Sequence, residues 1–121
     1  MGLTHVSVLI RSVGSTNGGG YVDQFLVDTG AIDSLAPSSE LIRAGIKPAG
    51  TVVYELADGA EQEFTVGAAE IEVLGVVTYG RVIFGPEGKE PILGVTALEQ
   101  AGMMVDPVTH TLKRRRALPL K

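Results

Sequence analysis

The sequence contains no cysteine, no tryptophan and only two histidines among its 121 residues. Without cysteine the chain can form no disulfide, no thiolate metal site and no cysteine nucleophile, and its redox compartment stays undetermined. The two histidines, His5 and His110, lack the paired spacing of metal ligands, so we expect no metal and no cofactor. No serine lies in a nucleophile-elbow sequence, which argues against a serine hydrolase.

Long apolar runs and a secretory leader are also missing. No stretch approaches the roughly 20 apolar residues that span a bilayer. The segment from Met1 to His5 lacks the basic and apolar parts of a signal peptide. The net charge of −4 provides no general attraction to nucleic acid. We therefore expect a cytoplasmic protein with neither a membrane nor a nucleic acid as its partner.

Positive charge is concentrated near the C-terminus, in Lys113-Arg114-Arg115-Arg116. A cluster of this kind can contact phosphate or an acidic membrane surface, which leaves open an adaptor role in binding nucleic acid or anionic lipid. No aromatic platform accompanies the cluster, so residues from about 114 to 121 are better interpreted as a solvated basic tail.

Hydrophobic residues make up 45% of the chain and charged residues 20%, which indicates a folded globular protein of one domain, residues 1–121. Apolar runs bounded by turn-forming residues predict strands. The predicted strands are 4–13, 21–27, 33–36, 51–56, 61–66, 70–77, 79–84, 103–106 and 111–113. Short helices are predicted between Pro37 and Gly45 and over 95–101, each closed by a glycine. This pattern, with 16 glycines, favours a compact all-β barrel.

Three features of the predicted strands bear on the arrangement of the sheet. In the first strand one face carries Thr4, Val6, Val8 and Ile10, and the other face carries His5, Ser7, Leu9 and Arg11. The step Asn17-Gly18 predicts a hairpin turn into the second strand. The segment Ala57-Asp58-Gly59-Ala60 predicts another turn, and its polar flanks favour a hairpin that projects from the body.

The stretch that carries the most chemistry is Phe25-Leu26-Val27-Asp28-Thr29-Gly30-Ala31, an apolar run that ends at a carboxylate. The apolar residues predict the end of a strand buried on both faces, so Asp28 falls where the strand opens into a loop. A carboxylate there is costly to desolvate unless it is hydrogen-bonded, paired or protonated. A strand followed by an ordinary Asp-Gly turn explains these residues equally well, so the triplet alone does not decide the function.

The other carboxylates have simpler interpretations. Asp58 lies in a predicted turn, where its side chain can bond to the backbone. Asp106 precedes Pro107 in a turn-initiating pair. The glutamates that alternate along the predicted strands are expected to face solvent rather than take part in catalysis. These are Glu61, Glu63, Glu70 and Glu72.

The order of three elements resembles that of the retropepsin-like (retroviral-type) aspartic proteases, in particular the small single-domain prokaryotic members. The elements are Leu26-Val27-Asp28-Thr29-Gly30-Ala31, the hairpin centred on Ala57-Asp58-Gly59-Ala60, and Ile92-Leu93-Gly94 leading into a short helix. The likeness extends from about His5 to about Lys113. It implies a retropepsin-like closed β-barrel with two short helices that acts as a homodimer.

The resemblance also implies a role for each residue of the Asp-Thr-Gly loop. In the family the aspartate activates a water for attack on a peptide carbonyl, so Asp28 would be the catalytic carboxylate of an endopeptidase acting on peptides or proteins. The hydroxyl of Thr29 would brace the two loops of the dimer across the symmetry axis. Gly30 would let the substrate backbone approach, and Ala31 would support the loop.

The resemblance assigns two further groups of residues. The hairpin would be a flap that closes over the substrate, and residues just after the catalytic loop would contact the substrate backbone. These substrate-binding residues are Asp33, Ser34, Ala57, Asp58, Gly59 and Ala60. Ile92, Leu93 and Gly94 would pack behind the catalytic loop.

A homodimer is expected on chemical grounds as well. Peptide hydrolysis of this kind needs two carboxylates at close range that share a proton, one acting as base and the other as acid. The chain has one Asp-Thr-Gly triplet. A two-fold symmetric homodimer would place two copies of Asp28 side by side and make a single site from two chains.

Two positions depart from the retroviral pattern. Retroviral enzymes usually carry an acidic residue two positions after the glycine and an arginine just after the second glycine, where this chain has Ile32 and Val95. The absence of this pair keeps open an alternative, a non-proteolytic retropepsin-like module for dimerisation or peptide binding. The intact Asp-Thr-Gly triplet favours the enzyme.

Overall fold

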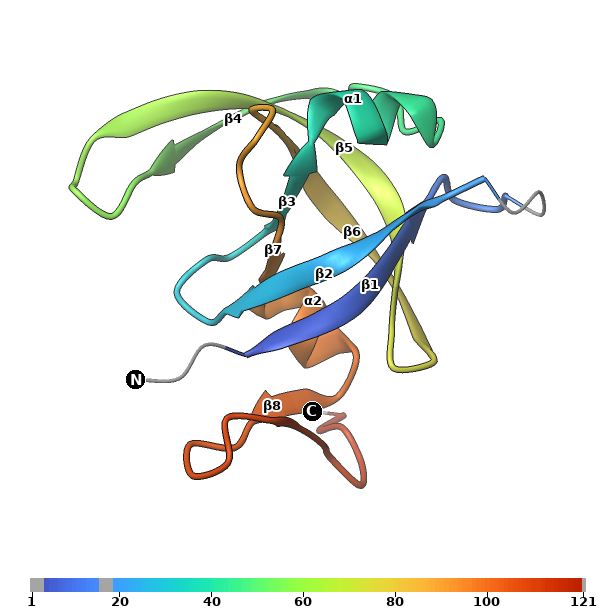
Figure 1. The fold of residues 1–121 in the computed structure, drawn as a ribbon, viewed down its shortest axis with the longest axis vertical. Helices are drawn as coiled ribbons and strands as arrows, with labels where there is room; N and C mark the ends of the chain where they lie inside the picture. The colour runs from blue at the N-terminus through green and yellow to red at the C-terminus, as the bar shows by residue number, and fades with distance from the viewer. Residues whose placement is uncertain (1–3, 16–18, 121) are drawn as a thin grey trace.

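The computed structural model describes residues 4–15 and 19–120, which form mostly β-sheet with two short helices (Figure 1). The all-β prediction is confirmed, while the predicted turn at Asn17-Gly18 lies outside the described residues. The strands are β1 His5–Arg11, β2 Tyr21–Asp28, β3 Ser34–Pro37, β4 Gly50–Glu55, β5 Glu61–Val73, β6 Val76–Gly85, β7 Ile92–Gly94, β8 Met103–Val105 and β9 Leu112–Arg114. The helices are α1 Ser38–Arg43 and α2 Val95–Gln100. Within this part of the chain no helix is long and apolar enough to cross a membrane.

Seven strands form one sheet in the order β1-β2-β7-β3-β6-β5-β4, and β1 makes an additional pairing with β5. β1 is antiparallel to both of its partners, opposing Leu26 of β2 with His5 and Val73 of β5 with Val8. β2 and β7 run parallel, which brings Asp28 opposite Gly94. β8 and β9 form a separate hairpin near the C-terminal end of the molecule, as Figure 1 shows.

The core lies on the inner face of this sheet and beneath the two helices. Val6, Val8 and Ile10 of β1 are buried, as their alternation predicts. Leu41 of α1 and Leu98 of α2 are buried in the same apolar cluster, so each helix covers part of the sheet with one face. Burial of these side chains is the main driving force for the fold.

The strands predicted at 61–66, 70–77 and 79–84 are wrong in number, because the chain forms two long strands, β5 and β6. The stretch Gly67-Ala68-Ala69 looks like a break but belongs to β5. A Cβ on Gly67 would lie 2.6 Å from the carbonyl oxygen of Lys47, so the glycine allows two segments to pack closely. Small residues there permit close packing and do not end the strand. The chain reverses at Leu74 and Gly75, which both have positive φ, 49° and 81°.

The prediction that Glu70 faces solvent is also wrong. Glu70 is only 8% exposed, and its carboxylate accepts a hydrogen bond from the guanidinium of Arg11. Arg11 of β1 lies directly opposite Glu70 of β5 in the strand register, and it also bonds to Glu72 at 3.3 Å. A cross-strand pair of opposite charge therefore joins β1 to β5.

The predicted basic tail is attached to the body at its beginning. Arg114 belongs to β9, and the backbone N–H of Arg115 donates to the carbonyl of Gly102 at 2.6 Å. Lys113 lies 3.2 Å from the carboxylate of Asp106. The hydrogen bond from the Val108 backbone, together with Lys113, lowers the pKa of Asp106 and holds the turn between β8 and β9.

Replacing Leu74 by Asn should stabilise the protein by about 0.5–1 kcal/mol, because leucine is disfavoured at positive φ and Asn-Gly is preferred in a two-residue hairpin turn. Leu74 is exposed, so little packing is lost. Denaturant unfolding at fixed protein concentration measures the difference. Leu74→Ala is the matched control, since alanine keeps the strained φ, and an Asn variant no more stable than the Ala variant would contradict the expectation.

Candidate active site

Asp28 is the last residue of β2, and its position depends on the parallel pairing with β7. Beyond Asp28 the chain leaves the sheet as a tight loop, in which Ala31 N–H donates to the carbonyl of Asp28 at 3.1 Å. The Oδ1 atom of Asp28 accepts a hydrogen bond from the backbone N–H of Gly30 at 2.9 Å. A Cβ on Gly30 would lie 3.3 Å from the same oxygen, so glycine leaves the carboxylate uncrowded. Asp28 is half-buried, which keeps this carboxylate reachable from solvent.

The first turn of α2 supports the loop from behind. The backbone N–H of Val95 donates to the carbonyl of Ala31 at 2.8 Å, and that of Thr96 donates to the carbonyl of Ile32 at 3.2 Å. N–H groups at the start of a helix have no partner within the helix, so these two bonds satisfy groups that would otherwise need water. The loop and α2 therefore hold each other in place.

The segment Ile92-Leu93-Gly94 lies directly behind the loop. Leu93 is fully buried, and a Cβ on Gly94 would lie 2.5 Å from the carbonyl carbon of Asp33, so only glycine fits at this approach of two backbones. Ser34, which we predicted to contact substrate, is 1% exposed, and its Oγ accepts a hydrogen bond from Gly94 N–H at 3.0 Å. Ser34 therefore stabilises the contact between β3 and β7.

The β4–β5 hairpin projects from the body on the side where the loop after β2 lies (Figure 1). Its turn is closed by backbone bonds from Leu56 N–H to the Ala60 carbonyl at 2.7 Å and from Gly59 N–H to the Leu56 carbonyl at 2.9 Å. The Asp58 carboxylate accepts from Ala60 N–H at 2.9 Å. Asp58 therefore has the turn-forming role that the sequence predicts.

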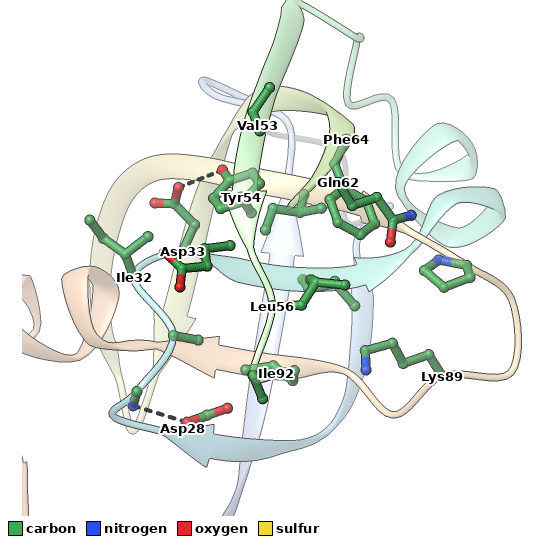
Figure 2. Close-up of a pocket in the computed structure, with 17 residues that line it drawn as sticks. Asp28, Ile32, Asp33, Val53, Tyr54, Leu56, Gln62, Phe64, Lys89 and Ile92 are labelled. Carbon is green, nitrogen blue, oxygen red and sulfur yellow. Dashed lines mark hydrogen bonds between the residues drawn. The ribbon is translucent and has the colours of Figure 1, made fainter. Parts of the chain in front are cut away.

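A pocket of about 850 Å³ separates the loop from the hairpin (Figure 2). Its walls are mainly apolar side chains from β3, β4, β5, β6 and β7. Of the predicted site residues, the pocket brings together Asp28, Gly30, Ala31, Asp33, Ala57 and Ile92. The residues that do not line it are Thr29, Ser34, Asp58, Gly59, Ala60, Leu93 and Gly94.

Asp33 connects the loop to two strands at the edge of this pocket. Its Oδ2 atom accepts hydrogen bonds from the hydroxyl of Tyr54 at 2.7 Å and from Nε of Arg81 at 2.8 Å. Tyr54 comes from the hairpin strand β4 and Arg81 from β6. Burial and the bond to Asp33 raise the pKa of Tyr54 to about 12, so the hydroxyl keeps its proton and acts as a donor at neutral pH. Asp33 thus lines the pocket and also joins the hairpin to the loop, a structural role that the sequence analysis did not predict.

Sequence reasoning missed Tyr54, Arg81 and Lys89, although each touches the pocket or a residue that lines it. Arg81 carries no clear signal in the sequence, because its side chain is 46% exposed and a cation at the surface needs no acidic partner. Lys89 lies in the loop between β6 and β7, where a lysine is unremarkable. Only the folded structure relates this side chain to the pocket.

That loop is fixed to the body at two places. The carboxylate of Glu87 accepts hydrogen bonds from the backbone N–H of Ser39 at 2.9 Å and from its hydroxyl at 2.6 Å. Glu90 bonds to the ring of His5 at 2.8 Å. The two bonds from Ser39 lower the pKa of Glu87. The loop is therefore ordered by its own side chains.

No cluster of three or more potential metal ligands occurs in residues 4–15 or 19–120. A scan against models of protein families found no match to the chain. A search of curated proteins also found no match. The likeness to retropepsin-like aspartic proteases therefore remains a prediction from the motifs.

Changing Tyr54 to Phe should destabilise the protein by about 1–3 kcal/mol, because it removes a hydrogen bond to a buried carboxylate. Amide hydrogen exchange in β4 and the hairpin turn should also become faster. Tyr79→Phe is the matched control, since Tyr79 is exposed and shows no hydrogen bond in the part of the chain described. Equal unfolding free energies and equal exchange in the two variants would argue against Asp33 as the link to the hairpin.

Changing Ser39 to Ala should raise the pKa of Glu87, since the hydroxyl bond that favours the carboxylate is lost. A folded-state pKa below the unfolded value stabilises the fold above the unfolded pKa, and this contribution disappears as pH falls through the folded value. Ser39→Ala should therefore be less stable than wild type at neutral pH and equally stable in acid. NMR titration of the Glu87 carboxyl measures its pKa, and thermal unfolding at neutral and acidic pH measures the stability. Ser7→Ala, at an exposed serine of β1, should change neither.

Proposed function

We propose that the protein is an aspartic endopeptidase of retropepsin-like fold whose active site is completed by a second copy of the chain. The observation that carries the proposal is the setting of Asp28. Its carboxylate ends strand β2, is held by the N–H of Gly30 and lines an apolar pocket beneath a projecting hairpin. A pocket with apolar walls and a few convergent polar groups suits a peptide substrate.

The reaction uses Asp28 of both subunits. One ionised Asp28 takes a proton from water while the water oxygen attacks the peptide carbonyl carbon. The other Asp28, protonated, gives its proton to the carbonyl oxygen, so that a neutral tetrahedral diol forms. The C–N bond then breaks, the nitrogen receives one proton from the pair, and a diol hydroxyl returns another to it. The pair ends with the single shared proton with which it began.

The strand pairings support the closed barrel. β1 bonds to β2 on one side and to β5 on the other. From β2 the sheet continues through β7, β3 and β6 to β5, and each of these strands pairs with the next. Strands paired in a ring have few free edges, which is how antiparallel barrels avoid association through exposed edges.

Exposed apolar side chains near the loop and the chain ends support the homodimer. The carbonyl of Thr4 accepts a hydrogen bond from Val27 N–H at 2.8 Å, and the Thr4 hydroxyl donates to the carbonyl of His110. The segment at Thr4 and the β8–β9 turn therefore lie beside the strand of Asp28. Apolar residues exposed in this region or in the C-terminal segment are Ile32, Met104, Val108, Leu118 and Leu120. A second copy would remove them from water. The hydroxyl of Thr29 has no partner among the described residues and is available to the other subunit.

The alternative function, peptide binding without cleavage, is favoured by one observation. Ile32 and Val95 replace the acidic residue and arginine usual in retroviral enzymes. In this chain Asp33 and Arg81 form an ion pair that anchors the same loop from a different strand. The loop is therefore still braced, which supports the enzyme over the binding module.

Changing Asp28 to Asn should lower cleavage of an unfolded protein substrate by about 100-fold or more, because asparagine cannot act as the base. The variant should remain a folded dimer, equally or more stable than wild type at neutral pH, since two adjacent carboxylates repel. Activity is measured as cleavage from acid to neutral pH, with and without a statine inhibitor. Thermal unfolding measures the stability, and sedimentation shows whether the variant is a dimer. Asp23→Asn, the same change on β2 outside the pocket, is the control.

Each other result has a defined meaning. Cleavage retained by the Asp28→Asn variant would exclude the aspartic protease mechanism. An unfolded variant would show that Asp28 is structural. Inactive wild-type protein that binds peptides would support the alternative function, and a fully active monomer would contradict the shared site.

A further inference from the structure

The pocket contains a basic side chain that the proposed chemistry does not use. Lys89, in the loop between β6 and β7, is the one basic residue among those that line the pocket. Figure 2 shows Lys89 on the other side of Ile92 from Asp28 in this view. Lys89 and Asp28 therefore border the same pocket, the space that a peptide would occupy.

The positive charge of Lys89 is not neutralised within the described chain. Its acidic neighbours are engaged elsewhere, Glu87 with Ser39 and Glu90 with His5. Glu55 also lines the pocket but shows no ion pair with Lys89. Strand alternation points Glu55 to the face of β4 opposite that of Tyr54, away from the apolar cluster.

The backbone that carries Lys89 is held in position. Besides the bonds of Glu87 and Glu90, the hydroxyl of Ser38 donates to the carbonyl of Gly85 at 2.9 Å at the beginning of the loop. Pro91 follows the loop, and its carbonyl accepts a hydrogen bond from Leu26 N–H at 2.9 Å. A charge on an anchored loop binds its partner with less loss of conformational freedom than a charge on a free one.

Lys89 is exposed, and the pocket that it lines has apolar walls. Leu35, Phe64, Ile83 and Ile92 line the pocket and belong to one hydrophobic cluster. The complementary ligand is a carboxylate next to an apolar group.

We propose that Lys89 binds a carboxylate of the peptide substrate, so that the enzyme prefers peptides with an apolar residue and a carboxylate near the cleaved bond. This inference rests on the proposed function. The carboxylate can belong to a glutamate or aspartate side chain or to the C-terminus of the substrate, since both present the same group. Lys89 would be a specificity-determining residue, with no part in the bond-breaking step.

The test uses the full-length protein and peptides that differ only by Glu or Gln at one position, scanned along both sides of the cleaved bond. Wild type should prefer the Glu peptide at one position by about fivefold in kcat/KM, mainly through KM, as expected for a partly exposed ion pair. Lys89→Glu should reverse this preference, and Lys89→Arg should retain it. Lys47→Glu, at an exposed lysine outside the pocket, should leave the Glu/Gln ratio unchanged.

A second comparison identifies the source of the carboxylate. Peptides with a free or an amidated C-terminus are cleaved in parallel. If amidation lowers the kcat/KM of wild type but not that of Lys89→Glu, the carboxylate is that of the C-terminus. If kcat/KM depends only on the Glu position, the carboxylate is that of a side chain. Cleavage with the same Glu/Gln ratio in wild type and Lys89→Glu, and with no effect of amidation, would overturn the inference while leaving the proposed function intact.

Binding to the Asp28→Asn variant separates the two proposals. Fluorescence anisotropy of the same labelled peptides needs no cleavage. If the wild-type protein cleaves no substrate, Glu-dependent binding to Asp28→Asn that disappears in Asp28→Asn/Lys89→Glu would support recognition by Lys89 and contradict the protease function. The absence of both cleavage and charge-dependent binding would overturn both proposals.

Discussion

The buried carboxylate of Asp33 is the interaction on which the candidate site depends most. Removing a charge from water is costly unless donors replace the lost hydration, so Asp33 needs both Tyr54 and Arg81. These donors belong to β4 and β6, and the backbone of Asp33 packs against Gly94 of β7. The loop after β2, the hairpin and the sheet therefore have one common point of attachment. The geometry around Asp28 follows from contacts a few residues away from it.

Much of the fold was predictable because it depends on local patterns. The alternation in β1 reflects which face of the strand is buried. The prediction that the run before Asp28 ends a strand buried on both faces is wrong, because Phe25 is buried while Leu26 and Val27 are partly exposed. The continuity of β5 was not predictable in this way. Its small residues are required by a backbone contact between Gly67 and Lys47, which are distant in sequence. A local reading cannot distinguish a close contact from a turn when both favour glycine.

The candidate site divides in the same way. The Asp28 loop and the segment Ile92–Gly94 are contiguous motifs, so their residues could be identified before their arrangement was known. Arg81 and Lys89 acquire meaning only from their neighbours in space, which depend on strand register and on the anchoring of a loop. Ser34 shows the opposite case, since a polar side chain near the motif serves a buried backbone N–H instead of the pocket.

The length of β5 determines how the hairpin can move. Its first half pairs with β4 and its second half with β6 and β1, so one continuous strand joins the hairpin to the rest of the sheet. Its 13 residues span about 40 Å at the usual rise of a strand. Gly67-Ala68-Ala69 lies near the middle of this strand, between the half that pairs with β4 and the half that pairs with β6 and β1. A small change in twist there becomes a large displacement at the tip, so the stiffness of a region remote from the pocket governs access to it.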